Sequence, residues 1–242
     1  MQPILQLTGI SKRFGAIVIA DRIDLVLGKG EAVGIIGPNG AGKTTLFGIV
    51  SGAMAPDAGA VLLDGQDVTR LSTDRRCRLG IARTHQIPQP FAAMTVFENL
   101  VVAAAFGQGK REREVYEECA AVLDRCGLLE QRNRLAGGLT LLDRKRLELA
   151  RALATKPRVL LLDEVAGGLT EHECADLVSL IKTIRNEGVS IIWIEHIVHA
   201  LTAVVQRLAV LYGGAIIAEG LPTEVIRQPR VQEIYMGVPA DA

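Results

Sequence analysis

Alternating apolar and polar residues open the chain. The alternation runs over residues 4–12 and 17–27, and glycine turns near residue 15 and at 28–30 bound the two segments. A period of two places apolar side chains on one face of a sheet, so these segments are predicted to be strands of a small antiparallel sheet. Residues 60–68, with an Asp-Gly turn between two short predicted strands, are expected to belong to the same antiparallel β-subdomain.

A second kind of strand is predicted from short, mostly apolar runs without alternation, which lie at residues 32–36, 81–84, 159–162 and 190–194. Strands without alternation are buried on both faces, as in parallel sheets covered by helices. A closing hairpin is predicted around Gly213-Gly214. The chain is therefore expected to have an α/β fold with a mixed sheet and helices on both of its faces.

Helical periodicity replaces the strand patterns from residue 95 to about residue 155. Thr95 and Glu98 have the spacing of a capping box, which predicts a helix over residues 96–106 that Gly107 and Gly109 end. Apolar residues then recur at helical spacing along one face. We expect this stretch to form a smaller helical subdomain inserted into the α/β core.

Composition narrows the possible classes of protein. The 242 residues are 49% apolar, which is ample for one large domain. Lys and Arg together number 27, as do Asp and Glu, so no basic field predicts a nucleic-acid partner. We find no signal peptide and no apolar run near the roughly 18 residues of a transmembrane helix, and we expect a cytoplasmic protein without a membrane span. The four cysteines lack metal-binding spacing and are expected to be reduced packing residues.

The most specific motif is the segment GPNGAGKTT at residues 37–45, which fits the phosphate-binding pattern G-x-x-x-x-G-K-[ST]. Glycines let consecutive backbone N–H groups turn toward a phosphate, and the helix that follows adds its positive end. Lys43 is expected against the β- and γ-phosphates and the Thr44 hydroxyl on Mg²⁺. The predicted binding residues are Gly37, Pro38, Asn39, Gly40, Ala41, Gly42, Lys43, Thr44 and Thr45.

Polar residues at the ends of three other predicted strands are candidates for chemistry. Asp163 and Glu164 follow one apolar run, at the edge where open α/β sheets bind ligands. Asp163 can bind Mg²⁺, and Glu164 can orient and polarise an attacking water. His196 follows another run and could contact a terminal phosphate, although a histidine taken alone is more often structural. Gln86 lies in a proline-containing loop after a third strand.

Taken together, these segments resemble the ATP-binding subunit of ABC transporters over essentially the whole chain. The resemblance implies a P-loop NTPase core that hydrolyses ATP with Mg²⁺, with Asp163 as metal ligand, Glu164 as general base and His196 as switch histidine. It also implies that Phe14 stacks on adenine, and that Gln86 contacts Mg²⁺ and senses the transporter. Lys43 would offset charge on the transferred phosphate.

The resemblance implies a single ABC ATPase domain over residues 1–242. Its expected parts are an antiparallel β-subdomain at 1–30 and 60–70, a RecA-like core at 31–86 and 157–220, a helical subdomain at 90–156 and C-terminal helices at 221–242.

Several segments look like the branched-chain, or hydrophobic, amino-acid importers within this family. They are residues 83–86, 94–100 and 146–153 and the tail from Ala218 to Gly237. This resemblance implies two transmembrane permease subunits as partners, a periplasmic binding protein as an indirect partner, and a location on the inner face of the cell membrane. The ATPase of a lipid or lipopolysaccharide exporter remains the alternative within transporters.

The chain departs from the family at the signature, where Leu-Ser-Gly-Gly-Gln is expected. That register holds Leu139, Thr140, Leu141, Leu142 and Asp143, while a similar segment at 135–139 lies four residues too early. Thr140 keeps a hydroxyl that could face nucleotide. The leucines would hinder approach to the γ-phosphate held by the opposite subunit, and the Asp143 charge would repel it. We expect a second, different ATPase subunit with a complete signature; the alternatives are tolerance of the leucines or a weakly hydrolysing ATP-binding module.

Other nucleotide-dependent classes fit less well. A GTPase would need an Asn-Lys-x-Asp segment, which is missing from the sequence. A DNA-repair ABC ATPase would carry a long coiled-coil or zinc insertion, and no heptads run between the P-loop and Asp163. Translation-associated ABC proteins usually hold two such cassettes in one chain.

Overall fold

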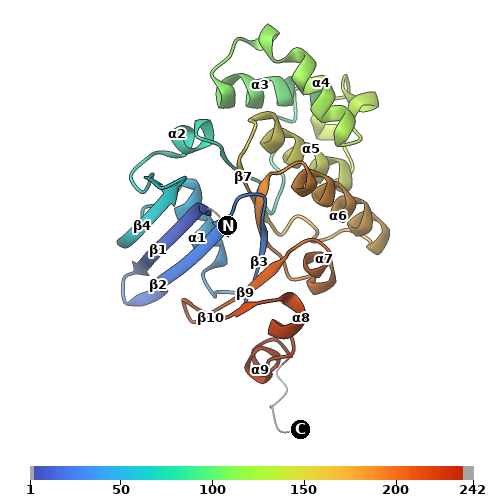
Figure 1. Ribbon diagram of the computed structural model, residues 1–242. Coiled ribbons are helices and arrows are strands. Elements are labelled where there is room, and N and C mark those ends of the chain that lie inside the picture. The colour runs from blue at the N-terminus through green and yellow to red at the C-terminus, as the bar shows by residue number, and fades with distance from the viewer. Residues whose placement is uncertain (1–2, 237–242) are drawn as a thin grey trace.

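The computed structural model describes residues 3–236 and contains two sheets with helices packed around them (Figure 1). One sheet is antiparallel with the order β2-β1-β4-β5. Its strands are β1 (Pro3–Phe14), β2 (Ile17–Gly28), β4 (Ala58–Leu63) and β5 (Gln66–Asp67). The antiparallel strands predicted from the alternation are confirmed. Residues 1–2 of the predicted β-subdomain and residues 237–242 of the predicted tail, including Gly237, lie outside the described residues.

The larger sheet has six strands in the order β10-β9-β3-β8-β7-β6. Neighbouring strands are parallel except β10, which pairs antiparallel with β9. The mixed sheet expected from the apolar runs is therefore confirmed. Its strands are β3 (Ala32–Ile36), β6 (Ile81–Arg83), β7 (Val159–Asp163), β8 (Ser190–Ile194), β9 (Arg207–Tyr212) and β10 (Ala215–Gly220).

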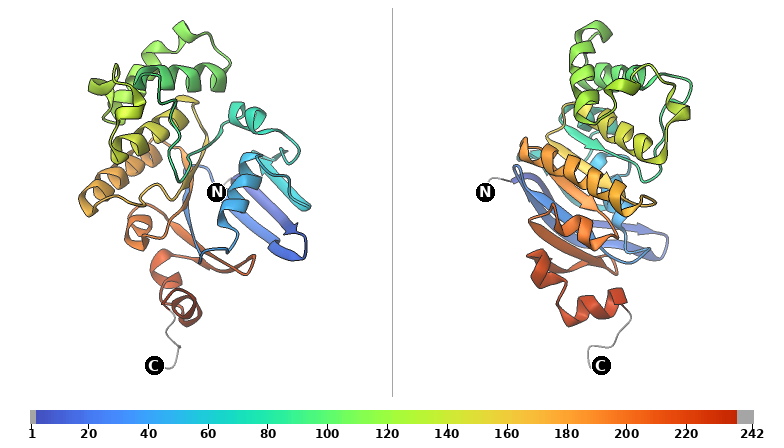
Figure 2. Two further views of the ribbon diagram at one scale, coloured as in Figure 1. Left: turned by 180° about the vertical axis from the view of Figure 1, so that it is seen from behind. Right: turned by 90° about the vertical axis from the view of Figure 1, so that its right-hand side faces the viewer.

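Successive residues of the central strands pack into two different hydrophobic clusters of the core. Ile192 and Ile194 of β8 belong to a cluster with Phe47 of α1 (Lys43–Ser51) and the apolar face of the antiparallel sheet. Ile191 and Trp193 belong to a second cluster with the helices on the other face of the large sheet. These helices include α5 (Leu141–Ala154), α6 (Glu171–Asn186) and α7 (Val198–Thr202), and Figure 2 shows them on one side of the sheet. Burial on both faces explains why the runs do not alternate.

Helices α3 (Val96–Gln108) and α4 (Tyr116–Arg125) lie at the far end from the C-terminal helices α8 (Pro222–Val225) and α9 (Pro229–Met236) (Figure 1). The remaining helix, α2 (Thr73–Arg78), lies beside the antiparallel sheet. Within residues 3–236, no helix combines the length and apolar character needed to cross a membrane.

The predicted start of α3 is confirmed, and its predicted end is corrected. Thr95 and Glu98 form the capping box through reciprocal side-chain and backbone hydrogen bonds. Gly107, however, lies inside the helix. A Cβ at Gly107 would lie 2.7 Å from Thr155 Cγ2, so this glycine lets α3 approach the end of α5. Gly109 ends the helix in the left-handed conformation with φ 67°.

Candidate functional site

The P-loop leaves the large sheet at the end of β3 and leads into α1. Gly42 precedes the helix with φ 101°, a conformation that favours glycine. A Cβ on Gly42 would lie 2.5 Å from the Ile19 carbonyl oxygen, and one on Gly37 would lie 2.2 Å from that of Leu211. These glycines therefore also admit the backbone of neighbouring strands, a requirement that the motif alone does not reveal.

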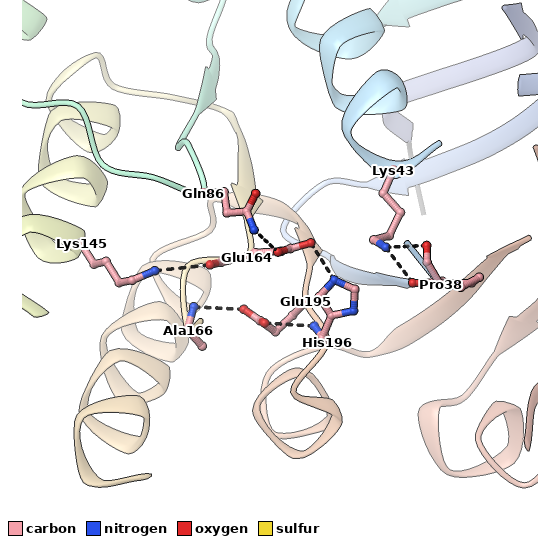
Figure 3. A network of polar contacts seen from close by, with 9 residues as sticks. Pro38, Lys43, Gln86, Lys145, Glu164, Ala166, Glu195 and His196 are labelled. Carbon is pink, nitrogen blue, oxygen red and sulfur yellow. Dashed lines mark hydrogen bonds and ion pairs between the residues drawn. The ribbon is translucent and has the colours of Figure 1, made fainter. Parts of the chain in front are cut away.

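Lys43 is the first residue of α1 and is buried. Its ammonium donates hydrogen bonds to the carbonyl oxygens of Gly37, at 2.7 Å, and Pro38, at 3.0 Å (Figure 3). Burial lowers the pKa of Lys43, while the charges of Glu164 and Asp163 oppose this shift. The first turn of α1 carries no side-chain cap and no acidic residue. The positive end of the helix is therefore suited to an external anion.

Glu164 meets two of the predicted site residues. Gln86 Nε2 donates to Glu164 Oε2 at 2.5 Å, and His196 Nε2 lies 2.7 Å from Glu164 Oε1 (Figure 3). Glu164 has φ 46°, so its backbone is in the left-handed region, where a non-glycine residue is strained. Glu164 and Gln86 line a pocket of about 310 Å³ together with the loop that contains Lys43. Three segments that are distant in sequence thus converge beside the P-loop.

Asp163 ends β7 and is paired with Arg83, a residue that the sequence analysis did not select. Arg83 Nη2 lies 2.7 Å from Asp163 Oδ2, and both side chains are largely buried. The guanidinium also lies 5.7 Å from the Phe47 ring centroid, which places it over an aromatic face. Because Arg83 is the last residue of β6 and β6 pairs with β7, its position at the same sheet edge was the available signal.

The predicted magnesium ligands have the chemistry that Mg²⁺ prefers. Thr44 offers a hydroxyl, Gln86 an amide oxygen and Asp163 a carboxylate, and all are hard oxygen donors. Among residues 3–236 no cluster of three or more His, Cys, Asp or Glu could enclose a metal ion. A Mg²⁺ ion that also binds nucleotide phosphates uses only one or two protein carboxylates.

Phe14 does not line the P-loop pocket, whereas Ile19 of β2 does. Phe14 lies at the end of β1 and is 49% exposed. The Lys12 ammonium lies 5.6 Å from the centroid of its ring. The ring is accessible to a flat base from solvent, and stacking on adenine stays a prediction.

The segment Leu139–Asp143 spans the N-terminus of α5. Thr140 is the N-cap, and its hydroxyl accepts from the Asp143 backbone N–H at 3.2 Å. The Leu141 side chain is 46% exposed and lies 3.4 Å from a Cβ placed on Gly168. The earlier segment, residues 135–139, instead contains the short 3₁₀ helix Ala136–Gly138.

Asp143 is less free to repel phosphate than expected. Its side chain is only 13% exposed, and Gln131 Nε2 donates to Oδ2 at 3.1 Å. Arg146 Nη1 lies 4.0 Å from Oδ1. These neighbours hold the Asp143 carboxylate close to Gln131 and Arg146.

Two buried charged residues near Glu164 were also not selected by the sequence analysis. Lys145 of α5 is 4% exposed and Glu195, directly after β8, is 1% exposed. Lys145 lies on the buried face of α5, which also carries Leu149. Glu195 directly precedes His196 in the sequence. A charged residue on the buried face of a helix was the signal that could have identified Lys145.

Comparisons with known proteins agree with this geometry. A family described as ABC transporter matches residues 20–167, and one described as Branched-chain amino acid ATP-binding cassette transporter matches residues 215–241. The high-affinity branched-chain amino acid transport ATP-binding protein BraF of Pseudomonas aeruginosa is 36% identical over 251 residues, covering 98% of each chain. The lipopolysaccharide export system ATP-binding protein LptB of Haemophilus influenzae is 31% identical and covers 97% of each. The ADP conformation of an ATP-binding cassette of an ABC transporter has a TM-score of 0.91 and 31% identity, covering 98% of this chain and 100% of that one.

Proposed function

Because the chain belongs to the ABC transporter family, we propose that it binds ATP and hydrolyses it to ADP and phosphate to power transport. The observation that carries this proposal is the placement of the Glu164 carboxylate in one pocket with the P-loop, held by Gln86 and His196. In this arrangement Lys43 binds the β- and γ-phosphates, Glu164 polarises the attacking water and His196 steadies the transferred phosphate. When bound, Mg²⁺ would supply further charge compensation at these phosphates, held by Thr44, Gln86 and Asp163.

The experiment that tests this role is Glu164→Gln, which removes the negative charge but keeps the shape of the side chain. We expect turnover to fall by about 10²–10⁴-fold, the typical contribution of a general base, with ATP binding retained. Steady-state phosphate release and equilibrium ATP binding measure the two effects. Glu130→Gln, at an exposed position on the 3₁₀ helix Leu129–Gln131, is the matched control. Unchanged turnover in Glu164→Gln would remove Glu164 from the role of base.

We propose branched-chain or other hydrophobic amino acids as the imported substrates. The support is the similarity to BraF over nearly the full length of both chains, together with the C-terminal match at residues 215–241. On this proposal the chain works on the inner face of the cell membrane with two permease subunits and, indirectly, a periplasmic binding protein. The division of residues 1–242 into β-subdomain, core, helical subdomain and C-terminal helices is part of the same proposal.

Lipopolysaccharide or lipid export is the second candidate, favoured by the 31% identity to LptB. The two candidates require different partners. Affinity purification of the native complex, followed by identification of its subunits, distinguishes them. A co-purifying periplasmic binding protein that binds hydrophobic amino acids would support import, and a lipid-extracting assembly would support export.

We further propose that the chain functions in a head-to-tail dimer with a different ATPase subunit. The support is the pair of leucines at Leu141 and Leu142, which stand at the start of α5 where the family has glycines. A partner with a complete signature would finish the site at Lys43, and the reciprocal site facing Thr140 would be weaker. Full-rate hydrolysis by the purified chain alone, equal to the rate with its partner, would overturn this proposal.

A further inference from the structure

Helix α5 reaches from the altered signature to the loop that carries Glu164. Lys145, one turn into the helix, is 4% exposed. Its ammonium donates to the backbone carbonyl oxygen of Glu164 at 3.4 Å (Figure 3). The contact is to the main chain of the proposed base, whose φ of 46° is strained. A donor on this carbonyl therefore helps to fix the peptide that sets the direction of the Glu164 side chain.

Glu195 approaches the same loop from the end of β8. Its carboxylate accepts from the backbone N–H of Ala166 through Oε2 and from that of His196 through Oε1, both at 3.0 Å. Glu195 thus joins the segment after Glu164 to the segment that presents His196. The two hydrogen bonds use both of its oxygens, and the side chain is 1% exposed.

Glu195 also places a negative charge near Lys145. Burial lowers the pKa of Lys145, and the charges of Glu195 and Glu164 oppose that shift. A buried charge is costly unless an opposite charge and hydrogen bonds compensate it. Figure 3 shows Lys145 entering from α5 and Glu195 from the end of β8, with the backbone of residues 164–166 between them.

We propose that Lys145 and Glu195 are a pair of positioning residues that hold Glu164 and His196 in register and tie both to the signature helix. This inference rests on the proposed ATPase function and adds a role that neither the P-loop nor the acidic strand end predicts. Neither residue touches the reacting groups through its own side chain. Their effect should therefore fall on the rate of hydrolysis and leave ATP binding at Lys43 intact.

The test uses the purified full-length chain, alone and in its native transporter complex. Lys145→Met removes the charge and the donor while keeping an unbranched side chain, and Lys145→Arg keeps both charge and donor. Lys182→Met, at an exposed position on α6, is the matched control. We expect Lys145→Met to lower kcat at least about tenfold with the KM for ATP within about twofold, and Lys145→Arg to restore most of the rate.

A double-mutant cycle with Glu195→Gln separates positioning from general stability. If the residues act as one unit, the double variant should lose no more turnover than the worse single variant. Thermal unfolding of every variant shows whether the fold survives. If Lys145→Met does not fold, the turnover of Glu195→Gln is compared with that of Lys145→Arg instead. A Glu195→Gln variant with the turnover of wild type would overturn the proposal.

Other results also overturn it. These are a kcat of Lys145→Met equal to that of Lys182→Met, an equal loss in Lys145→Met and Lys145→Arg, and losses that multiply in the double variant. A chain that is not an ATPase would give a result distinguishable from these. The wild-type protein would then show no more turnover than Glu164→Gln, even in the native complex.

Discussion

The N-termini of α1 and α5 differ in how they treat negative charge. Helix α1 begins at Lys43 after a left-handed glycine, without a side-chain cap and without an acidic residue in its first turn. Helix α5 is capped by the Thr140 hydroxyl and carries Asp143 in its first turn. The first terminus thus suits an anion from outside, whereas the second is already satisfied by its own side chains.

We infer from this difference that the N-terminus of α1 suits the binding of ATP, whereas the N-terminus of α5 is less suited to completing the ATP site of a partner subunit. A helix N-terminus without a side-chain cap gains much from a phosphate, because its backbone N–H groups and its positive dipole end favour an anion. A self-capped terminus flanked by the exposed Leu141 side chain gains less from the γ-phosphate of a partner's nucleotide. The comparison therefore predicts that substitutions at the N-terminus of α1 alter ATP affinity, and that substitutions at the N-terminus of α5 alter cooperation between subunits or stability.

Among substitutions at the two helix N-termini, Lys43→Ala is expected to have the largest effect. Removing the ammonium deletes charge-assisted hydrogen bonds to two phosphates, so ATP affinity should fall about 100-fold, or about 2.7 kcal/mol. Equilibrium ATP binding to the purified chain measures it, with Lys182→Ala as the surface control. Affinity within twofold of wild type would show that the α1 terminus is not the phosphate site.

The accuracy of the sequence-based predictions follows from how local each signal is. The strands and the P-loop rest on neighbouring residues, namely apolar period, glycine spacing and the lysine that opens the helix. The meeting of Gln86, Glu164 and His196 was implied by family resemblance and by strand ends that share one sheet edge. Their hydrogen bonds to one another needed the structure.

Contacts between residues that are far apart in the chain could not be predicted from the sequence. Arg83 and Asp163 are 80 positions apart and meet because β6 and β7 are neighbours in the sheet. Lys145 reaches Glu164 only because α5 crosses beside the loop after β7. The error at Gly107 has a similar cause, since a glycine that ends a helix and one that admits a neighbour look alike in sequence.

A smaller effect is expected from restoring the signature. Replacing Leu141 and Leu142 with Gly and Asp143 with Gln should raise turnover by the chain alone about tenfold, equivalent to about 1.4 kcal/mol in the barrier. The reason is that the α5 terminus could then approach the nucleotide of a second copy. Phosphate release at saturating ATP measures the change.

Two glycines at a helix start cost stability, about 1 kcal/mol each, so the fold of the triple variant must be checked by thermal unfolding. Leu135→Gly, at an exposed leucine in the look-alike segment, is the matched control. A well-folded triple variant with the wild-type rate would contradict the obstruction by leucine, and with it the need for a different partner.

The smallest effect distinguishes the two termini most sharply. Thr140→Ala removes the α5 cap and should lower the free energy of unfolding by about 1 kcal/mol without changing ATP affinity. Thr170→Ala, which removes the equivalent cap of α6, should lower the free energy of unfolding by a similar amount.

Thr44→Ala in the first turn of α1 should show the opposite pattern. Mg²⁺-dependent ATP binding should weaken while stability stays unchanged, because that helix has no side-chain cap to lose. Denaturant unfolding and ATP binding with and without Mg²⁺ measure both properties. If Thr140→Ala weakened ATP binding as Thr44→Ala does, the division of roles between α1 and α5 would be wrong.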